Sequence, residues 1–182
     1  MKDLSLHILD IAQNSVSAQA KNMIIEIKED TQLNTYSIHI QDDGKGIPAD
    51  ILERVTDPYY TSRTTRKVGL GLPLFKQNAE MAGGQFTIQS LPGRGTRVMA
   101  TFLHDHFDRP PLGDIAGVLI ILISSNPEIE WYYKHVLNEK EYIFDTREVK
   151  EVLEDMPLNE PSVGRYLKEM IRENLKELGV GN

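Results

Sequence analysis

The 182-residue sequence predicts an α+β fold. Two hydrophobic periods occur along it: a helical period, as in residues 3–19, and a two-residue alternation rich in isoleucine, as in residues 21–29. A hydrophobic content of 40% and a charged content of 26% are ordinary for a soluble globular domain. The length corresponds to about one to one and a half domains.

The first part of the chain is predicted to contain two main helices and four strands. The helix over residues 3–19 has its apolar side chains in one stripe. The remaining elements, in chain order, are strands over 21–29 and 36–41, a short helix over 49–55, a polar basic loop over 57–68, a helix over 72–82 that ends at Gly83, and strands over 85–90 and 96–104.

A boundary is predicted at residues 108–114, where two prolines and a glycine interrupt regular structure. It separates a first domain, residues 1–107, from an acidic C-terminal extension, residues 108–182. The elements expected in the extension are a buried strand over 117–124 (a helix there stays open), a hairpin over 130–136 and 141–145, a helix over 147–155 capped by Thr146, and a last helix from Ser162 to about 178, ended by Gly179.

Charge and composition exclude several classes of function. Acidic residues outnumber basic ones by 27 to 20, which argues against a nucleic-acid protein that works by bulk positive charge. The absence of cysteine excludes disulfides, thiolate metal sites and cysteine nucleophiles. The longest apolar run, residues 115–123, is too short for a membrane span, which needs roughly 20 residues. We expect a cytoplasmic protein that binds neither nucleic acid nor membrane.

The motif Asp42-Asp43-Gly44-Lys45-Gly46-Ile47 directly follows a predicted strand. A carboxylate at a strand end can accept a hydrogen bond from a buried amine, and the glycines allow the backbone to approach a flat ring. An Asp-Gly hairpin turn explains the motif equally well when it is taken alone.

Three weaker signals accompany this motif. Asp10 and Asn14 are four residues apart on one helical face, where an amide oxygen suits Mg²⁺ and a carboxylate can accept a proton. A solvated polar face is the simpler interpretation of that pair alone. The glycines of residues 69–71 open a helix, where free N–H groups suit phosphate. Residues 93–96, Gly-Arg-Gly-Thr, are by themselves typical of a hairpin turn.

The order of these motifs makes residues 6–104 resemble the ATP-binding domain shared by histidine kinases, gyrases, mismatch-repair ATPases and heat-shock chaperone ATPases. LDIAQNSVSA is similar to the asparagine box of that family, QDDGKGIP to its first glycine box, DPYYTSRTTRKVGLGL to its second, and GRGTRVMATF to its last motif. The resemblance implies a Bergerat-type fold, which is a two-layer α/β sandwich with a mixed sheet and helices on one face.

The resemblance also implies a role for each matching residue. Asp42 would bind the adenine amino group, Gly44 and Gly46 would shape the adenine pocket, and Ile47 would form its wall. Asn14 would hold Mg²⁺ between the phosphates, and Asp10 would be the general base, although the family usually has glutamate there. Backbone N–H groups of Gly69, Leu70 and Gly71 would bind the phosphates. One of the lid residues Arg63, Arg66 and Lys67 would contact the γ-phosphate, and Thr96 would help to close the pocket.

The resembling kinases carry their phosphoacceptor histidine on a helical hairpin that precedes this domain. Here the first predicted helix begins near residue 3, so we expect a stand-alone protein whose phosphoacceptor or other protein partner is separate. His7 is expected to be a packed or surface histidine rather than a phosphate acceptor, and the pair His104 and His106 has no third metal ligand nearby. The predicted function is Mg-ATP binding with phosphate transfer or slow hydrolysis. A non-catalytic, ATP-switched binding module, as among anti-sigma-factor relatives, is the alternative, and a gyrase-like gate is the third.

Overall fold

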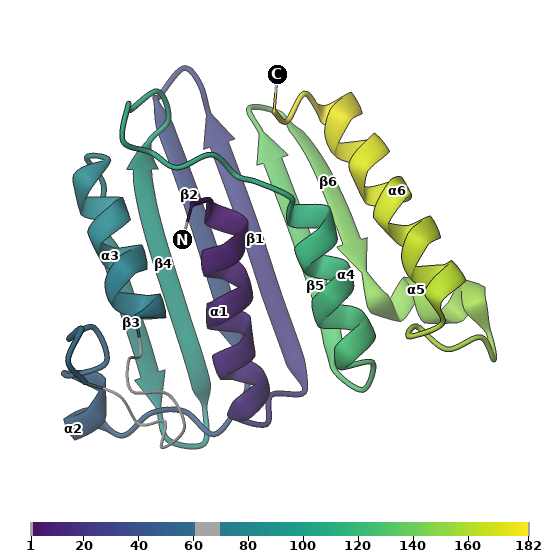
Figure 1. The fold of residues 1–182 in the computed structure, drawn as a ribbon, viewed down its shortest axis with the longest axis horizontal. Helices are drawn as coiled ribbons and strands as arrows, with labels where there is room; N and C mark the ends of the chain where they lie inside the picture. Colours follow the sequence, from purple (N-terminus) through teal and green to yellow (C-terminus); the bar gives the residue numbers. More distant parts are fainter. Residues whose placement is uncertain (1, 61–69, 182) are drawn as a thin grey trace.

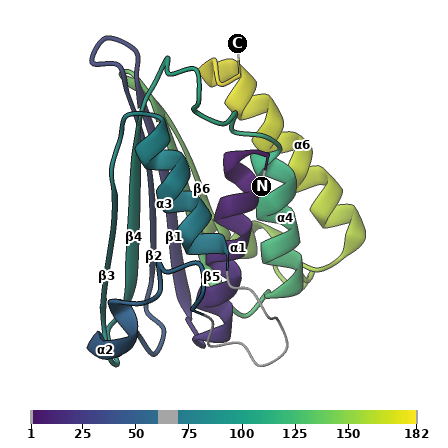
Figure 2. The same ribbon diagram turned by 60° about the vertical axis from the view of Figure 1, so that its left-hand side comes forward.

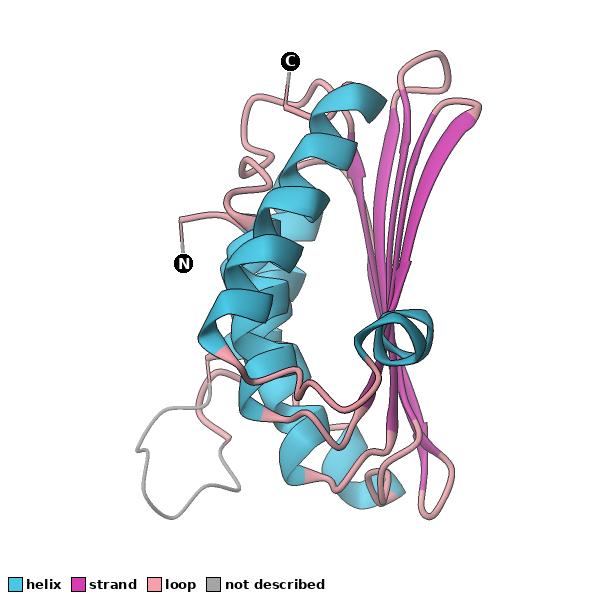
Figure 3. Ribbon diagram, turned by 90° about the vertical axis from the view of Figure 1, so that its right-hand side faces the viewer, coloured by secondary structure: helices cyan, strands magenta, loops and turns pink. Residues whose placement is uncertain are grey.

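A computed structural model describes residues 2–60 and 70–181. Its centre is a six-stranded sheet in the order β3-β4-β2-β1-β5-β6, and the long helices cover one face of that sheet (Figures 1 and 3). Neighbouring strands are antiparallel except β1 and β5, which are parallel. The predicted α+β, two-layer arrangement with a mixed sheet is confirmed.

The strands are β1 (Asn22–Asp30), β2 (Thr35–Asp42), β3 (Phe86–Leu91), β4 (Gly95–Leu103), β5 (Glu130–Leu137) and β6 (Lys140–Asp145). The helices are α1 (Leu4–Ser17), α2 (Ala49–Leu52), α3 (Gly71–Met81), α4 (Ile115–Ser125), α5 (Thr146–Leu153) and α6 (Pro161–Leu178). All four strands and both main helices predicted in the first part are present. The short helix predicted over 49–55 ends at Leu52, and the loop predicted over 57–68 falls mostly outside the described residues.

The core lies between the helical layer and one face of the sheet. Alternate residues of β1, such as Ile25 and Ile27, are buried against the helices, as a strand with one covered face requires. The stripe predicted on α1 meets them, since Leu4, Ile8 and Ala12 have no exposed surface. The C-terminal end of α1 is therefore held near the end of β2. This packing positions the polar residues in the last turns of α1.

The strand predicted over residues 117–124 is wrong, because this segment forms helix α4. The Asp114 carboxylate caps the helix by accepting a hydrogen bond from the Gly117 N–H at 3.0 Å. The helix packs between α1, α6 and the sheet, so it is apolar on almost every side (Figures 1 and 2). A helix whose residues are almost all apolar shows little amphipathic period in its sequence, and its β-branched run then resembles a buried strand.

The extension continues the sheet of the first part. Strand β5 pairs in parallel with β1, and β6 follows β5 through the predicted hairpin, whose turn has Asn138 at φ +55°. The last helix ends at Gly179, which adopts φ +99° as predicted. Two predicted caps are wrong: α6 begins at Pro161, one residue before Ser162, and the cap of α5 is Asp145.

Thr146 does not cap α5 because its hydroxyl is used elsewhere. It donates to the Glu130 carboxylate at 2.8 Å and accepts from the Trp131 N–H at 2.9 Å. The Asp145 carboxylate instead accepts from the Arg147 N–H at 2.9 Å. None of the helices within the described ranges is long and apolar enough to cross a bilayer.

Candidate nucleotide site

The predicted site residues that the structure describes lie toward one end of the sheet, where α1 and β2 end and α3 begins (lower part of Figure 1). Asp42 is the last residue of β2, Asn14 lies in the last turn of α1, and Gly71 is the first residue of α3. Three segments far apart in the sequence thus supply an acidic residue, an amide and a helix N-terminus to one region.

The Asp42 carboxylate is buried and held by two hydrogen bonds. The Ser15 hydroxyl donates to Oδ2 at 2.5 Å, and the Gly44 N–H donates to Oδ1 at 2.8 Å. Each carboxylate oxygen can accept a second hydrogen bond, so the group keeps the capacity to accept from a ligand. Ser15 was not predicted, although a serine within the apolar stripe of α1 is a detectable signal.

The glycines allow the turn after Asp42 to pack tightly. A Cβ at Gly44 would lie 2.8 Å from the Ala18 carbonyl oxygen, and a Cβ at Gly46, where φ is +73°, would overlap the Leu91 carbonyl. The Lys45 N–H donates to the Ala18 carbonyl at 2.9 Å. The turn is followed by α2 and not by a pairing strand, so the alternative of an Asp-Gly hairpin is excluded.

Thr96 stands beside Asp42 because the two residues pair across β2 and β4. Its hydroxyl lies 2.8 Å from that of Ser90, and the Ser90 hydroxyl accepts from the Ile47 N–H at 2.8 Å. Ser90 therefore connects the last predicted motif to the first glycine box. It lies in a strand outside every recognised motif, so no local pattern identified it.

Asp10 lies against the start of α3. A Cβ at Gly71 would overlap Oδ2 of Asp10, so only glycine leaves room for this carboxylate. A negative charge is favourable at the positive end of a helix. Asn14, one turn later on α1, is half-buried, and Leu70 is exposed. Arg63, Arg66, Lys67 and Gly69 lie outside the described residues.

Asp43 anchors the same turn to the start of β1. Its carboxylate accepts from the backbone N–H groups of Lys21 at 2.7 Å and Asn22 at 2.9 Å, and from the Asn22 side-chain amide at 2.8 Å. Burial acts to raise the pKa of the Asp43 carboxyl, but these hydrogen bonds outweigh it and hold the pKa below its ordinary value. Asn22 was not predicted as a site residue.

His7 and His104 make their contacts in or beside the core rather than at the candidate site. His7 has no exposed surface, stacks on Phe75 and pairs with the Asn78 amide at 2.8 Å. His104 lies 2.8 Å from the Glu29 carboxylate. In the part of the chain that the structure describes, no three acidic or histidine side chains converge to bind a metal.

The donors present fit a magnesium-bound nucleotide. Asn14 and Asp10 offer hard oxygen atoms, which Mg²⁺ prefers, and it commonly takes only one or two protein ligands with water and phosphate. The start of α3 offers backbone N–H groups to phosphate. Asp42 offers a buried acceptor within a glycine turn that a Cβ would fill.

Comparisons with known proteins agree with this geometry. Residues 2–106 match the family described as histidine kinase-, DNA gyrase B-, and HSP90-like ATPase. The sensor histidine kinase YxdK of Bacillus subtilis is 33% identical over 107 residues, which cover 56% of this chain and 33% of the kinase. The sensor histidine kinase ZraS of Escherichia coli O157:H7 is 32% identical over 90 residues, 50% of this chain and 19% of the kinase.

The chain thus spans a third or less of the length of these relatives. A crystal structure of the N-terminal domain of a DNA repair protein superposes with a TM-score of 0.53 at 18% identity, covering 79% of this chain and 52% of that one. This likeness shows the fold alone. Since the family match covers more than half of the residues, the chain belongs to the histidine kinase-, DNA gyrase B- and HSP90-like ATPases.

Proposed function

We propose that the chain binds Mg-ATP at this site and transfers the γ-phosphoryl group to a separate protein in signalling. The observation that carries the proposal is the buried Asp42 carboxylate, oriented by Ser15 and Gly44, at the edge of a glycine turn. A carboxylate fixed in this way suits the 6-amino group of adenine, which is a hydrogen-bond donor.

The chemistry would then occur between Asp10 and the start of α3. An acceptor oxygen or nitrogen attacks the γ-phosphorus, the bond to the β–γ bridging oxygen breaks, and ADP leaves. The proton of the acceptor passes to the Asp10 carboxylate. Mg²⁺, when bound through Asn14, supplies charge neutralisation along the phosphates.

A separate acceptor is favoured by the burial of His7. Helix α1 contains one histidine, His7, which lies one turn before Asp10. Its side chain has no exposed surface from which to accept a phosphoryl group. His135 and His104 both contact Glu29, at the opposite end of β1 from the strand residue that pairs with Asp42. Met23 and Glu29 are six residue steps apart along the strand, which is roughly 20 Å.

Incubation with γ-labelled ATP, Mg²⁺ and fractionated candidate proteins tests the proposal. We expect label on a second protein with the wild-type chain and none with Asp10→Asn. A Mg-ATP complex that neither labels a protein nor releases phosphate would contradict the enzymatic function.

The second candidate is a binding module switched by ATP without turnover. It is favoured by Asp10, which is one methylene shorter than the glutamate usual in the family and lies packed against Gly71. Pull-downs with and without Mg-ATP, using the wild type and Asp10→Asn, separate the two functions. A variant that retains ATP-dependent capture of a partner but loses phosphate transfer indicates that catalysis and switching are distinct. A wild type that captures a partner but never labels it favours the switch.

A further inference from the structure

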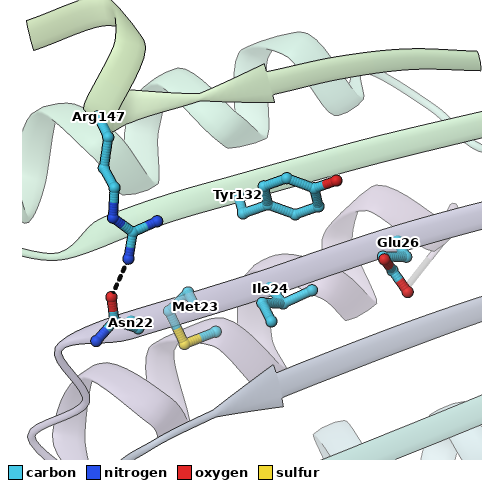
Figure 4. A pocket seen from close by; sticks show the side chains of 6 residues that line it. All are labelled: Asn22, Met23, Ile24, Glu26, Tyr132 and Arg147. Carbon is cyan, nitrogen blue, oxygen red and sulfur yellow. Dashed lines mark hydrogen bonds between the residues drawn. The ribbon is translucent and has the colours of Figure 1, made fainter. Parts of the chain in front are cut away.

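Arg147, in the first turn of α5, contacts the anchor of the adenine-binding turn. Its guanidinium donates a hydrogen bond to the side-chain oxygen of Asn22 (Figure 4). The nitrogen of the same amide donates to the Asp43 carboxylate at 2.8 Å. The Asn22 side chain therefore uses both of its functional atoms, one toward the extension and one toward the turn that follows Asp42.

This arrangement fixes the orientation of the Asn22 amide. An amide can bind in two orientations related by a flip, and they exchange the positions of its donor and its acceptor. The Arg147 guanidinium has donors only, so it selects the orientation in which the Asn22 nitrogen points to Asp43. The Asp43 carboxylate, which only accepts, selects the same orientation. Loss of Arg147 therefore leaves the Asn22 amide bonded to Asp43 but removes the contact that holds its oxygen in place.

The consequence reaches Asp42 through one peptide bond. Asp43 is held by Asn22 and Lys21, Gly44 donates to Asp42, and Lys45 is held by Ala18, so the turn is attached at consecutive residues. Its attachment to β1 is the one that Arg147 supports. The Arg147 side chain is about half exposed and lines a hollow of about 390 Å³ on the open face of the sheet, beside Tyr132 and Ile24 (Figure 4).

We infer that Asn22 and Arg147 are positioning residues for adenine recognition, through which the C-terminal extension sets the placement of the Asp42 carboxylate. The inference rests on the proposed binding of ATP. An interaction that moves the Arg147 guanidinium away from Asn22, toward the open face of the sheet, would then lower ATP affinity without contacting the nucleotide.

The test compares ATP with ITP, whose base has a carbonyl oxygen in place of the 6-amino group. Asp42 can accept a hydrogen bond from the amino group of ATP but not from that oxygen. We expect Arg147→Ala to weaken ATP binding roughly threefold to tenfold, the effect of one hydrogen bond, and to change ITP binding less than about twofold. Calorimetry with the full-length chain and Mg²⁺ measures both affinities.

Lys150→Ala is the matched control. Lys150 lies on the same helix, carries the same charge and pairs with Glu130 at 2.7 Å rather than with Asn22. It should leave both affinities unchanged. Arg147→Lys, which restores a donor and the charge, should recover part of the ATP affinity. In an Asp42→Asn background, Arg147→Ala should cause no further loss.

The outcomes separate the inference from the function on which it rests. If the wild type binds no ATP, the proposed function itself fails. If the wild type binds ATP and Arg147→Ala binds it equally well, the positioning role is overturned. Equal losses for ATP and ITP overturn it too, because they indicate a general structural defect. Asn22→Asp, which keeps an acceptor for Arg147 but removes the donor to Asp43, should reproduce the selective loss of ATP affinity.

Discussion

In the proposed adenine site, the Asp42 carboxylate is the expected hydrogen-bond acceptor for the base. We expect Asp42→Asn to weaken ATP binding by about 2 kcal/mol, since a charge-assisted hydrogen bond in a buried site is lost. Calorimetry measures the effect. Asp50→Asn removes an exposed acid from nearby α2 and should leave the affinity unchanged. An unchanged ATP affinity in Asp42→Asn would contradict the assignment of the adenine site.

His7 makes stability depend on pH. Burial lowers the pKa of its imidazole from 6.5 to about 4. Below pH 6.5 the unfolded chain therefore binds a proton that the folded chain does not, so the free energy of unfolding falls as the pH drops toward 4. Between pH 7 and pH 5 this single group should cost about 2 kcal/mol.

Urea denaturation at both pH values checks this prediction. The loss between pH 7 and pH 5 should be about 2 kcal/mol smaller in His7→Leu than in the wild type. His106→Gln, which changes a partly exposed histidine, should behave as the wild type does. An identical pH dependence in His7→Leu would show that the buried imidazole does not carry the effect.

At the residue scale, the sequence predicted a turn where the residues concerned form one contiguous motif. Asp42, Gly44 and Gly46 fall in one six-residue segment, so their spacing alone indicates a turn with a carboxylate. Ser15, Ser90 and Arg147 act through partners 27, 43 and 125 positions away. Such contacts exist only once the strands are in register, and a single sequence does not contain that register.

At the scale of elements, helix α4 shows what hydrophobic patterns can and cannot predict. The amphipathic segments were identified correctly, because α1, α3 and α6 each bury one stripe. Helix α4 lies between α1 and α6 in the helical layer, and almost all of its residues are apolar (Figure 1). The hydrophobic periodicity of such a segment does not distinguish a helix from a strand. Its β-branched residues then favour a strand, which is the wrong prediction here.

Substitutions at two positions of α4 distinguish a helix from a strand. Leu119 is 1% exposed and Ile121 is 53% exposed, although a strand would place both on one face. We expect Leu119→Ala to lower the free energy of unfolding by about 2–5 kcal/mol and Ile121→Ala by less than about 1 kcal/mol. Equal, large losses in urea denaturation would instead indicate a strand.

At the scale of the whole molecule, the charge and the fold divide the chain differently. Residues 105–182 carry the whole net charge of −7, since the first 104 residues contain 11 basic and 11 acidic side chains. The sheet nevertheless continues across that point, from β1 to β5. Surface charge is therefore a poor guide to where the cooperative unit of this fold ends.

The segment at the predicted boundary also takes part in the first domain. The carbonyl groups of Pro111 and Leu112 accept hydrogen bonds at 2.9 and 2.8 Å from the N–H groups of Leu4 and Ser5, which begin α1. These N–H groups have no partner within the helix itself. Residues 108–114 are thus expected to support the helix that carries Asp10 and Asn14.

We therefore predict that residues 1–107 do not form a stable ATP-binding unit by themselves. Removing 108–182 exposes the β1 edge that pairs with β5, the apolar surface under α4 and the first turn of α1. An unpaired hydrophobic edge promotes aggregation, so the fragment should lack a cooperative thermal transition and should bind no ATP. Circular dichroism and calorimetry measure both properties, and the full-length chain, purified in parallel, is the control. A fragment that melts cooperatively and binds ATP as tightly as the full-length chain would show instead that the first 107 residues are an independent domain.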